Sequence, residues 1–116
     1  MYTNMHLVRK TGSSDLSSAA LSLTTNHPGK ARLLMVLLRA SAAITETVTV
    51  TWTSKDGTAY SVVLDTTNLS TAQNYVFRPT GDCILEEGDT IVLTCTKANN
   101  TGIVYATIIM QDLGKR

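Results

Sequence analysis

The sequence predicts an all-β domain, an antiparallel β-sandwich or jelly roll of about seven to nine strands. Three observations support this fold class. Apolar and polar residues alternate with a period of two over several segments, which places them on opposite faces of strands. Threonine, a β-branched residue that favours strands, supplies much of the polar side. Turn-forming residues recur at the short spacing that is typical of sandwiches and barrels.

The clearest strand is predicted for residues 44–53. Apolar side chains alternate there with an unbroken series of threonines, and Glu46 is the charged residue that interrupts the apolar parity. This period of two indicates one apolar face and one hydroxyl face. We therefore expect Val48, Val50 and Trp52 to be buried, with Trp52 in the core and not on a ligand-binding platform. The threonines should face away from that core.

A hairpin is predicted to follow this strand, because Asp56-Gly57 is a strong two-residue turn signal. Its second strand is expected at residues 58–65, where Tyr60, Val62 and Leu64 share one face. The hairpin would extend the sheet by one strand.

Two later segments also have the alternation of strands. Residues 90–97 place Ile91, Leu93 and Cys95 on one side and mostly threonines on the other. Residues 103–110 are largely apolar on both sides. We expect this last strand to be central in its sheet or to have one face covered by a partner subunit.

The segment 30–41 is ambiguous, because its continuous apolar run Leu33–Leu38 suits either a buried strand or a buried helix. We favour a strand, since a turn at residues 26–29 precedes it and its neighbours are strands. The remaining expected elements are weaker strands at residues 5–9 and 16–23, a short strand at 74–78, turns at 79–82 and 98–102, and a loop at 66–73 with room for one helical turn.

The length of 116 residues fits one domain. We expect residues 30–116 to form the sandwich core. Residues 1–29 should supply an N-terminal arm and the first strands of the same domain. The pattern is weakest in this N-terminal part, which makes it the expected arm for contacts with other chains.

The composition argues against several classes of partner. Charged residues make up 16% of the chain and the net charge is +1, with no run of Lys and Arg, so nucleic-acid binding is not expected. The apolar run Leu33–Leu38 is far too short to span a bilayer. The segment Met1–Lys10 has no apolar region of a secretory signal. We therefore expect synthesis in a host cytoplasm and no membrane contact.

The two cysteines are predicted to be buried free thiols. A turn at residues 86–89 would pair Cys83 with Val92 and place Cys95 opposite Thr80. The two sulfurs would then lie several residues out of register, which is too far for a disulfide.

The sequence offers little that could perform chemistry, so we predict no catalytic residue, no metal and no cofactor. His6, His27, Cys83 and Cys95 lack the spacing of a zinc site, and His27 is expected to be a solvated loop residue. A second cluster does not match the ligand pattern of an EF-hand calcium site; its residues are Asp82, Glu86, Glu87 and Asp89. Residues 86–89 are expected to form an exposed turn instead.

The segment Ile84-Leu85-Glu86-Glu87-Gly88-Asp89-Thr90-Ile91-Val92-Leu93 is followed by a polar turn and an alternating last strand. Upstream, residues 30–36 precede the threonine-rich strand and Asp56-Gly57. This order, over about residues 30–111, resembles the small β-sandwich virion structural proteins of tailed bacteriophages. The resemblance implies a virion component and provides no active site whose residues could be carried over.

The favoured function is therefore a non-enzymatic capsid decoration or cement protein that binds the major capsid protein, located in the virion and forming a homo-oligomer. The first alternative is a neck, tail or baseplate subunit of a phage particle. Others are a carbohydrate-binding β-sandwich module, which should show a line of exposed aromatic rings or a calcium site, and a small enzyme with an unrecognised site.

Overall fold

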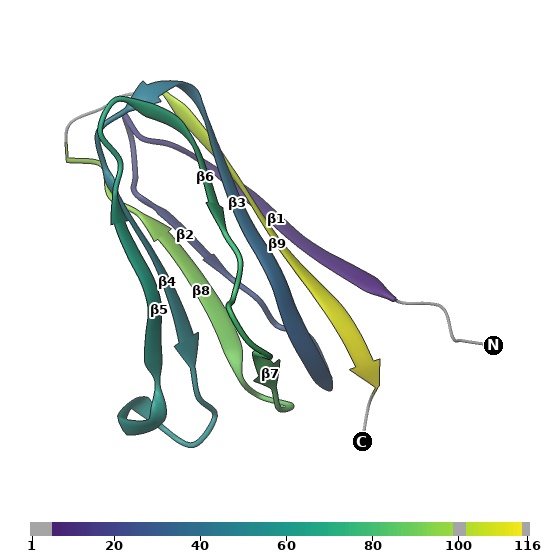
Figure 1. Cartoon of the computed structure of the whole chain (residues 1–116). Helices are drawn as coiled ribbons and strands as arrows, with labels where there is room; N and C mark the ends of the chain where they lie inside the picture. The colour runs from purple at the N-terminus through teal and green to yellow at the C-terminus, as the bar shows by residue number, and fades with distance from the viewer. Residues whose placement is uncertain (1–5, 99–101, 115–116) are drawn as a thin grey trace.

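In the computed structural model, which describes residues 6–98 and 102–114, the chain forms two antiparallel β-sheets packed face to face (Figure 1). The all-β sandwich predicted from the sequence is confirmed. The elements are β1 (Leu7–Asp15), β2 (Leu21–Thr24), β3 (Lys30–Ile44), β4 (Thr47–Thr53), the short 3₁₀ turn η1 (Thr58–Tyr60), β5 (Val62–Asn68), β6 (Ala72–Phe77), β7 (Ile84–Leu85), β8 (Thr90–Cys95) and β9 (Ile103–Gly114).

The order of the strands identifies the sandwich as a jelly roll. The first sheet has the order β1-β9-β3-β6, with β7 also paired to β3, and the second sheet has the order β2-β8-β4-β5. The antiparallel pairs β1–β9, β2–β8, β3–β6 and β4–β5 fall alternately in the first and the second sheet. A chain folded in half and then wound around a barrel axis produces this order, which is the jelly-roll topology.

The core lies between the sheets and receives alternate residues from each strand. Val36 on β3 and Ile108 on β9 fill it from the first sheet, and Val50 on β4 and Leu93 on β8 fill it from the second. Burial of each such aliphatic side chain contributes about 1.5–3 kcal/mol. The expected burial of Val48 and Val50 is confirmed.

Two predictions about the first sheet are also confirmed. The ambiguous segment is the long strand β3, and β9 is central, hydrogen-bonded to β1 on one side and to β3 on the other. The pairing of β3 with β9 shifts register between Leu33 and Met35. This bulge lets Leu34 and Met35 both remain partly exposed while the strand continues to bury Leu33 and Val36.

The β4–β5 hairpin exists, but its loop is longer than the sequence predicts. Residues 58–60 form η1, β5 begins only at Val62, and Trp52 pairs with Val62. Gly57, with φ of 121°, redirects the chain into η1. Trp52 is only partly buried, so the prediction that it belongs to the core is confirmed in part: its ring packs against the edge of the core. It lies one residue from the end of β4, and its indole N–H donates to Oδ2 of Asp89 at 3.2 Å.

Other boundaries differ from the expected ones. The loop expected at residues 66–73 has no helical turn, because β5 extends to Asn68 and β6 begins at Ala72, with Thr71 in a left-handed conformation at φ of 51°. The strand expected at residues 16–23 is shorter and begins at Leu21. Residues 1–5 of the predicted arm and residues 99–101 of the predicted turn lie outside the described residues.

Both cysteines are buried free thiols, as predicted, although the pairing behind that prediction is wrong. Cys83 precedes β7, which pairs with β3 in the first sheet, whereas Cys95 ends β8 in the second sheet. The turn that precedes β8 therefore joins the two sheets and does not close a hairpin. Burial raises the pKa of both thiols, that of Cys95 to about 11 with a contribution from the Glu46 carboxylate.

A hydrogen bond between the sheets joins β6 to β5. The buried Tyr75 hydroxyl donates to Oδ2 of Asp65 at 2.5 Å, and the Thr67 hydroxyl donates to the same oxygen at 2.8 Å. Burial and the neighbouring carboxylate raise the pKa of Tyr75, so its hydroxyl stays protonated and remains a donor. The contact therefore links β6, an edge strand of the first sheet, to β5, an edge strand of the second.

Replacing Tyr75 with Phe removes this hydrogen bond and preserves the ring. We expect the free energy of unfolding to fall by about 1.5–3 kcal/mol, the usual contribution of a hydrogen bond to a charged group. Urea denaturation measures the loss. Tyr105→Phe is the control, because that ring is exposed and its replacement should change stability by less than about 0.5 kcal/mol. Equal effects of the two substitutions would contradict a stabilising role for the Tyr75–Asp65 contact.

Candidate interaction surfaces

The residues considered for a zinc or calcium site do not assemble into one. Within residues 6–98 and 102–114, no three His, Cys, Asp or Glu side chains come together in a way that could hold a metal ion. Asp82 and Glu86 form exposed ion pairs with Arg32 and Lys30, at 3.9 and 3.7 Å. In the same part of the chain, no helix is long and apolar enough to cross a membrane.

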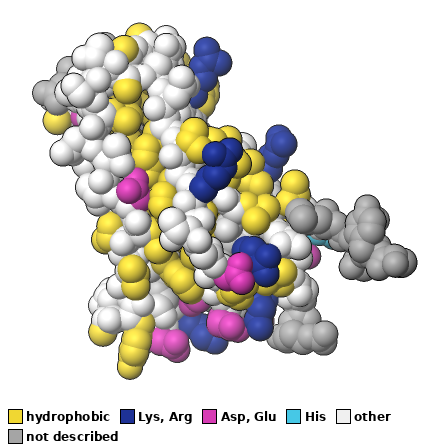
Figure 2. All heavy atoms as spheres, in the orientation of Figure 1, with side chains coloured by type: hydrophobic (Ala, Val, Ile, Leu, Met, Phe, Trp, Pro, Cys, Tyr) yellow, Lys and Arg dark blue, Asp and Glu magenta, His cyan; other side chains and the backbone are white. Residues whose placement is uncertain are grey.

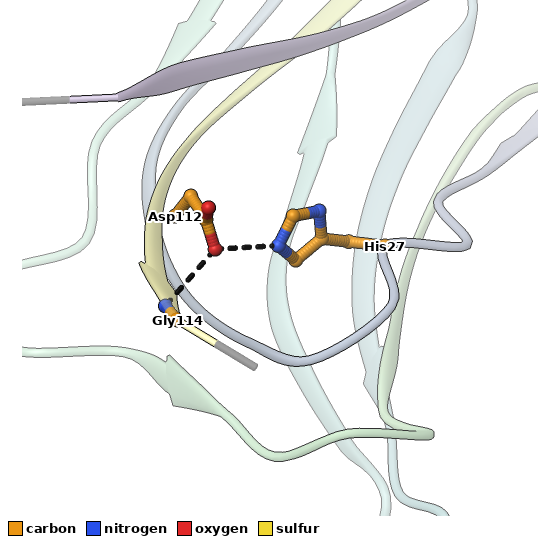
Figure 3. A network of polar contacts seen from close by, with 3 residues as sticks. All are labelled: His27, Asp112 and Gly114. Carbon is orange, nitrogen blue, oxygen red and sulfur yellow. Dashed lines mark hydrogen bonds and ion pairs between the residues drawn. The ribbon is translucent and has the colours of Figure 1, made fainter. Parts of the chain in front are cut away.

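His27 has a structural contact that the sequence does not reveal. Its Nε2 lies 3.1 Å from Oδ1 of Asp112, and the same oxygen accepts the Gly114 N–H at 3.0 Å (Figure 3). Both hydrogen bonds lower the pKa of Asp112, and the one from Gly114 has the larger effect. The expectation of a solvated loop histidine is wrong, because the imidazole is 14% exposed and joins the turn before β3 to the end of β9.

Asp89 is the other polar residue whose role the sequence does not reveal. The expected turn forms, since the Asp89 N–H donates to the Glu86 carbonyl at 3.0 Å, but the Asp89 side chain is buried. Its carboxylate accepts the Lys55 N–H at 2.8 Å, the Glu86 N–H at 3.0 Å and the Trp52 indole N–H. This carboxylate therefore holds the loop of the β4–β5 hairpin against the turn before β8.

The outer side of the first sheet carries exposed apolar side chains among polar and basic ones. Outward residues from β1, β9, β3 and β6 form cross-strand rows. One row is Ser13, Tyr105, Arg39 and Asn74; the next is Thr11, Thr107, Leu37 and Val76; a third contains Arg9, Ile109 and Met35. We call these eleven residues, with Ile103, the apolar face. Tyr105 and Val76 are each 52% exposed.

The charges on the apolar face are basic. Arg9 and Arg39 are exposed and form no ion pair within the described part of the chain. Figure 2 shows yellow apolar and blue basic side chains next to each other over the region where Figure 1 draws β3 and β9. Tyr105 stands between two shallow depressions of about 310 and 340 Å³, one toward β3 and β6 and one toward β1.

The outer side of the second sheet differs in chemistry. One of its cross-strand rows consists of Ser22, Thr94, Thr49 and Thr66, and the next consists of Thr24, Val92, Thr51 and Val63. We call the serine and the threonines of these two rows the hydroxyl face. The prediction that the β4 threonines point away from the core is consistent with this register. A surface of hydroxyl groups remains well hydrated, so the drive to cover it is weaker than for the apolar face.

The β4–β5 hairpin carries a second exposed apolar group. Tyr60 on η1 is 69% exposed, Val63 is 58% exposed, and Val62 is exposed beside them. We call Asp56, Tyr60, Val62 and Val63 the hairpin tip. In Figure 2, yellow and magenta side chains meet at the lower end of the molecule, where Figure 1 draws η1.

The described aromatic rings do not form the line expected of a sugar-binding platform. Tyr60 belongs to the hairpin tip and Tyr105 to the apolar face, on different sheets. Trp52 lines an apolar hollow with Leu64 and Phe77, but its indole N–H is bound to Asp89.

No family model and no curated protein sequence matches this chain. Among solved structures, the Drosophila NLP core, described in terms of pentamer formation and histone binding, is 10% identical at a TM-score of 0.49 and covers 96% of this chain and 100% of its own. PirA is 11% identical at 0.49, with coverages of 93% and 96%. A chain of the virus-like particle of extra small virus, from the giant freshwater prawn Macrobrachium rosenbergii, is 18% identical at a TM-score of 0.36; the match covers 99% of this chain and 85% of that one. Similarities at this level carry no weight for function, and the resemblance to phage virion proteins remains a prediction.

Proposed function

We propose that this chain is a non-enzymatic structural protein of a virus particle, held in place by contacts with other protein chains. The observation that carries the proposal is the apolar face. An exposed sheet surface that combines Tyr105, Val76 and Ile103 with arginines has the composition of a protein–protein interface, in which Tyr and Arg are enriched. The sequence resemblance supports the finer assignment to a phage capsid decoration or cement protein on the major capsid protein.

The acidic groups described above support a structural role over a catalytic one. Asp65 accepts hydrogen bonds from Tyr75 and Thr67, and Asp89 accepts three N–H donors. The buried Glu46 accepts the Thr96 hydroxyl at 2.6 Å and the Ala98 N–H at 2.9 Å. Carboxylates engaged in this way stabilise the fold, and a general acid or base instead needs free access to a substrate proton.

A neck, tail or baseplate position is the alternative for the same surface, because a flat apolar face suits a ring as well as a shell. The predicted N-terminal arm is part of the proposal for either position. From Leu7 onward, however, the chain pairs with β9 and contributes to the first sheet. Residues 7–15 of the predicted arm are therefore a strand of the sandwich.

The proposal predicts that the protein is found in purified particles and that the apolar face is needed there. Tyr105→Glu removes the exposed ring of this face and places a carboxylate beside Arg39, and it should reduce incorporation at least about tenfold, because the loss of an aromatic anchor removes more than about 1.4 kcal/mol of binding. Thr94→Glu on the hydroxyl face is the matched control and should be incorporated normally. Quantitative mass spectrometry of purified heads and tails gives both the amount and the position.

Absence of the wild-type protein from particles would contradict the proposed function. Its presence in tails alone would reject the capsid assignment in favour of the alternative. Equal incorporation of the Tyr105→Glu and wild-type proteins would show that another surface makes the attachment.

A further inference from the structure

We propose that the hairpin tip of one copy of this chain binds the apolar face of a second copy, so that copies associate head to tail. The inference rests on the proposed function in one respect, that the apolar face is buried against protein, and it names the partner there. Three properties of the two surfaces indicate that a second copy covers the apolar face. They are the exposed apolar groups of both surfaces, their charges and their positions on different sheets.

The hairpin tip is an exposed apolar group on a firmly held loop. The Gly57 N–H donates to the Ser54 carbonyl at 3.2 Å, the Tyr60 N–H to the Gly57 carbonyl at 3.1 Å, and the Ser54 N–H to the Ser61 hydroxyl at 3.0 Å. Asp89 holds the same loop through the Lys55 N–H. Because the loop is already ordered, little conformational entropy is lost when Tyr60 enters a partner surface.

The apolar face offers a place for such a ring. The depression beside Tyr105 is lined by residues of β9, β3 and β6, among them the apolar Leu37 and Val76 and the polar Asn74 and Thr107. The depression has a volume of about 310 Å³ and is open to solvent, so an aromatic ring can lie against its apolar lining without first displacing another side chain. An aromatic side chain at the centre of an interface is the usual energetic anchor of protein association.

The charges of the two surfaces are complementary. Arg39 lines the depression, and Asp56 is exposed on the hairpin tip. Neither forms an ion pair with another described residue. A symmetric contact between two apolar faces would instead place Arg9 and Arg39 of both copies in one interface, without an acidic residue of that face to pair with them, and an excess of like charge at an interface is unfavourable.

The positions of the surfaces make the contact repeatable. The apolar face is the outer side of the first sheet, and the hairpin tip extends from β4 and β5 of the second sheet. Each copy can therefore use both surfaces at once, which is the condition for a heterologous contact. Such a contact closes into a ring or continues as a chain, and either product suits a component of a particle.

Two variants and their mixture test the proposal by multi-angle light scattering during size-exclusion chromatography. Wild-type protein should form oligomers whose mass increases with concentration. Tyr60→Asp and Tyr105→Glu should each be monomeric alone. An equimolar mixture should form a one-to-one dimer and nothing larger, because only the intact tip of the Tyr105→Glu chain and the intact face of the Tyr60→Asp chain can meet. Thr94→Glu should retain the wild-type mass.

Other results would overturn the head-to-tail contact. A monomeric wild-type protein at high concentration would do so, and so would Tyr60→Asp protein that still forms oligomers, since a symmetric contact between apolar faces would survive that change. Val76→Ser on β6 serves as a second face variant if Tyr105→Glu lowers the melting temperature. Particle incorporation is measured separately, so a monomer found in particles would reject this inference alone, and an oligomer absent from particles would reject only the proposed function.

Discussion

Replacing Asp89 with Ala is expected to lower the free energy of unfolding by about 3–4 kcal/mol. The carboxylate accepts the N–H groups of Lys55 and Glu86 and the indole N–H of Trp52. Each hydrogen bond to a charged acceptor contributes about 1.5–3 kcal/mol, and the three are not additive because they share one group. Trp52 is the single tryptophan of the chain, so its fluorescence follows this contact during urea denaturation.

The same contact gives the stability a defined pH dependence. Burial alone would raise the pKa of Asp89, but the hydrogen bonds from Lys55, Glu86 and Trp52 outweigh it and lower the pKa below its ordinary value. The contribution of Asp89 is therefore complete above the pKa of the unfolded chain, about 3.9, and is lost as the pH falls through the lower folded value. In the Asp89→Ala protein this part of the acid-induced loss should be missing.

Asp56→Ala is the matched control for Asp89→Ala, since Asp56 lies on the hairpin loop that Asp89 holds but is itself exposed. Its replacement should change stability by less than about 0.5 kcal/mol. If Asp89→Ala were no more destabilising than Asp56→Ala, Asp89 would be an ordinary surface residue, as the sequence suggests.

The strands with regular alternation could be predicted from the sequence, and Asp89 could not. Burial at every second residue of β8 follows directly from the pattern Ile91, Leu93, Cys95, and the threonine parity of β4 defines the hydroxyl face. The run Glu86-Glu87-Gly88-Asp89 has the composition of an exposed turn and does form one. Only the packing of two distant loops brings its last carboxylate to Lys55 and Trp52.

The path between β7 and β8 could not be predicted for a related reason. A turn at residues 86–89 has the same local geometry whether it closes a hairpin or crosses between sheets. Strand β7 has two residues, too few for a periodicity that would assign it to a sheet. The buried state of Cys83 and Cys95 was predictable from their apolar neighbours, whereas the reason they stay apart required the topology.

The two proposed surfaces differ in how visible they are in the sequence. The outward apolar residues of β9 alternate with its core residues, so the two-sided pattern already indicates a central or covered strand. The hairpin tip is hidden, because Tyr60, Val62 and Leu64 have the spacing of one strand face. The 3₁₀ turn separates Tyr60 from the strand and exposes it, and three residues carry too little pattern to predict such a turn.

Neighbouring isoleucines on β9 allow the two sides of this strand to be tested separately. Ile108→Ala is expected to lower the free energy of unfolding by about 3–5 kcal/mol, the usual cost of removing a large side chain from a packed core. Ile108 is fully buried, paired with Lys10 of β1 and Val36 of β3. Because β1 and β3 are hydrogen-bonded to β9 on its two sides, the backbone around Ile108 cannot move in to fill the cavity that the substitution leaves.

Ile109→Ala removes the same atoms from the opposite side of the strand, where the side chain is only partly buried beside Arg9 and Met35. The free energy of unfolding of the isolated domain should fall by no more than about 1 kcal/mol. The reason is that folding removes only part of the Ile109 side chain from water, so its truncation forfeits little hydrophobic stabilisation. Urea denaturation of dilute, monomeric protein compares the two variants. Equal losses would mean that the outer side of β9 is part of the core of a single copy. A large loss for Ile108→Ala alone would mean that the apolar residues on the outer side are surplus to folding, which is the property expected of a surface that is covered by another chain.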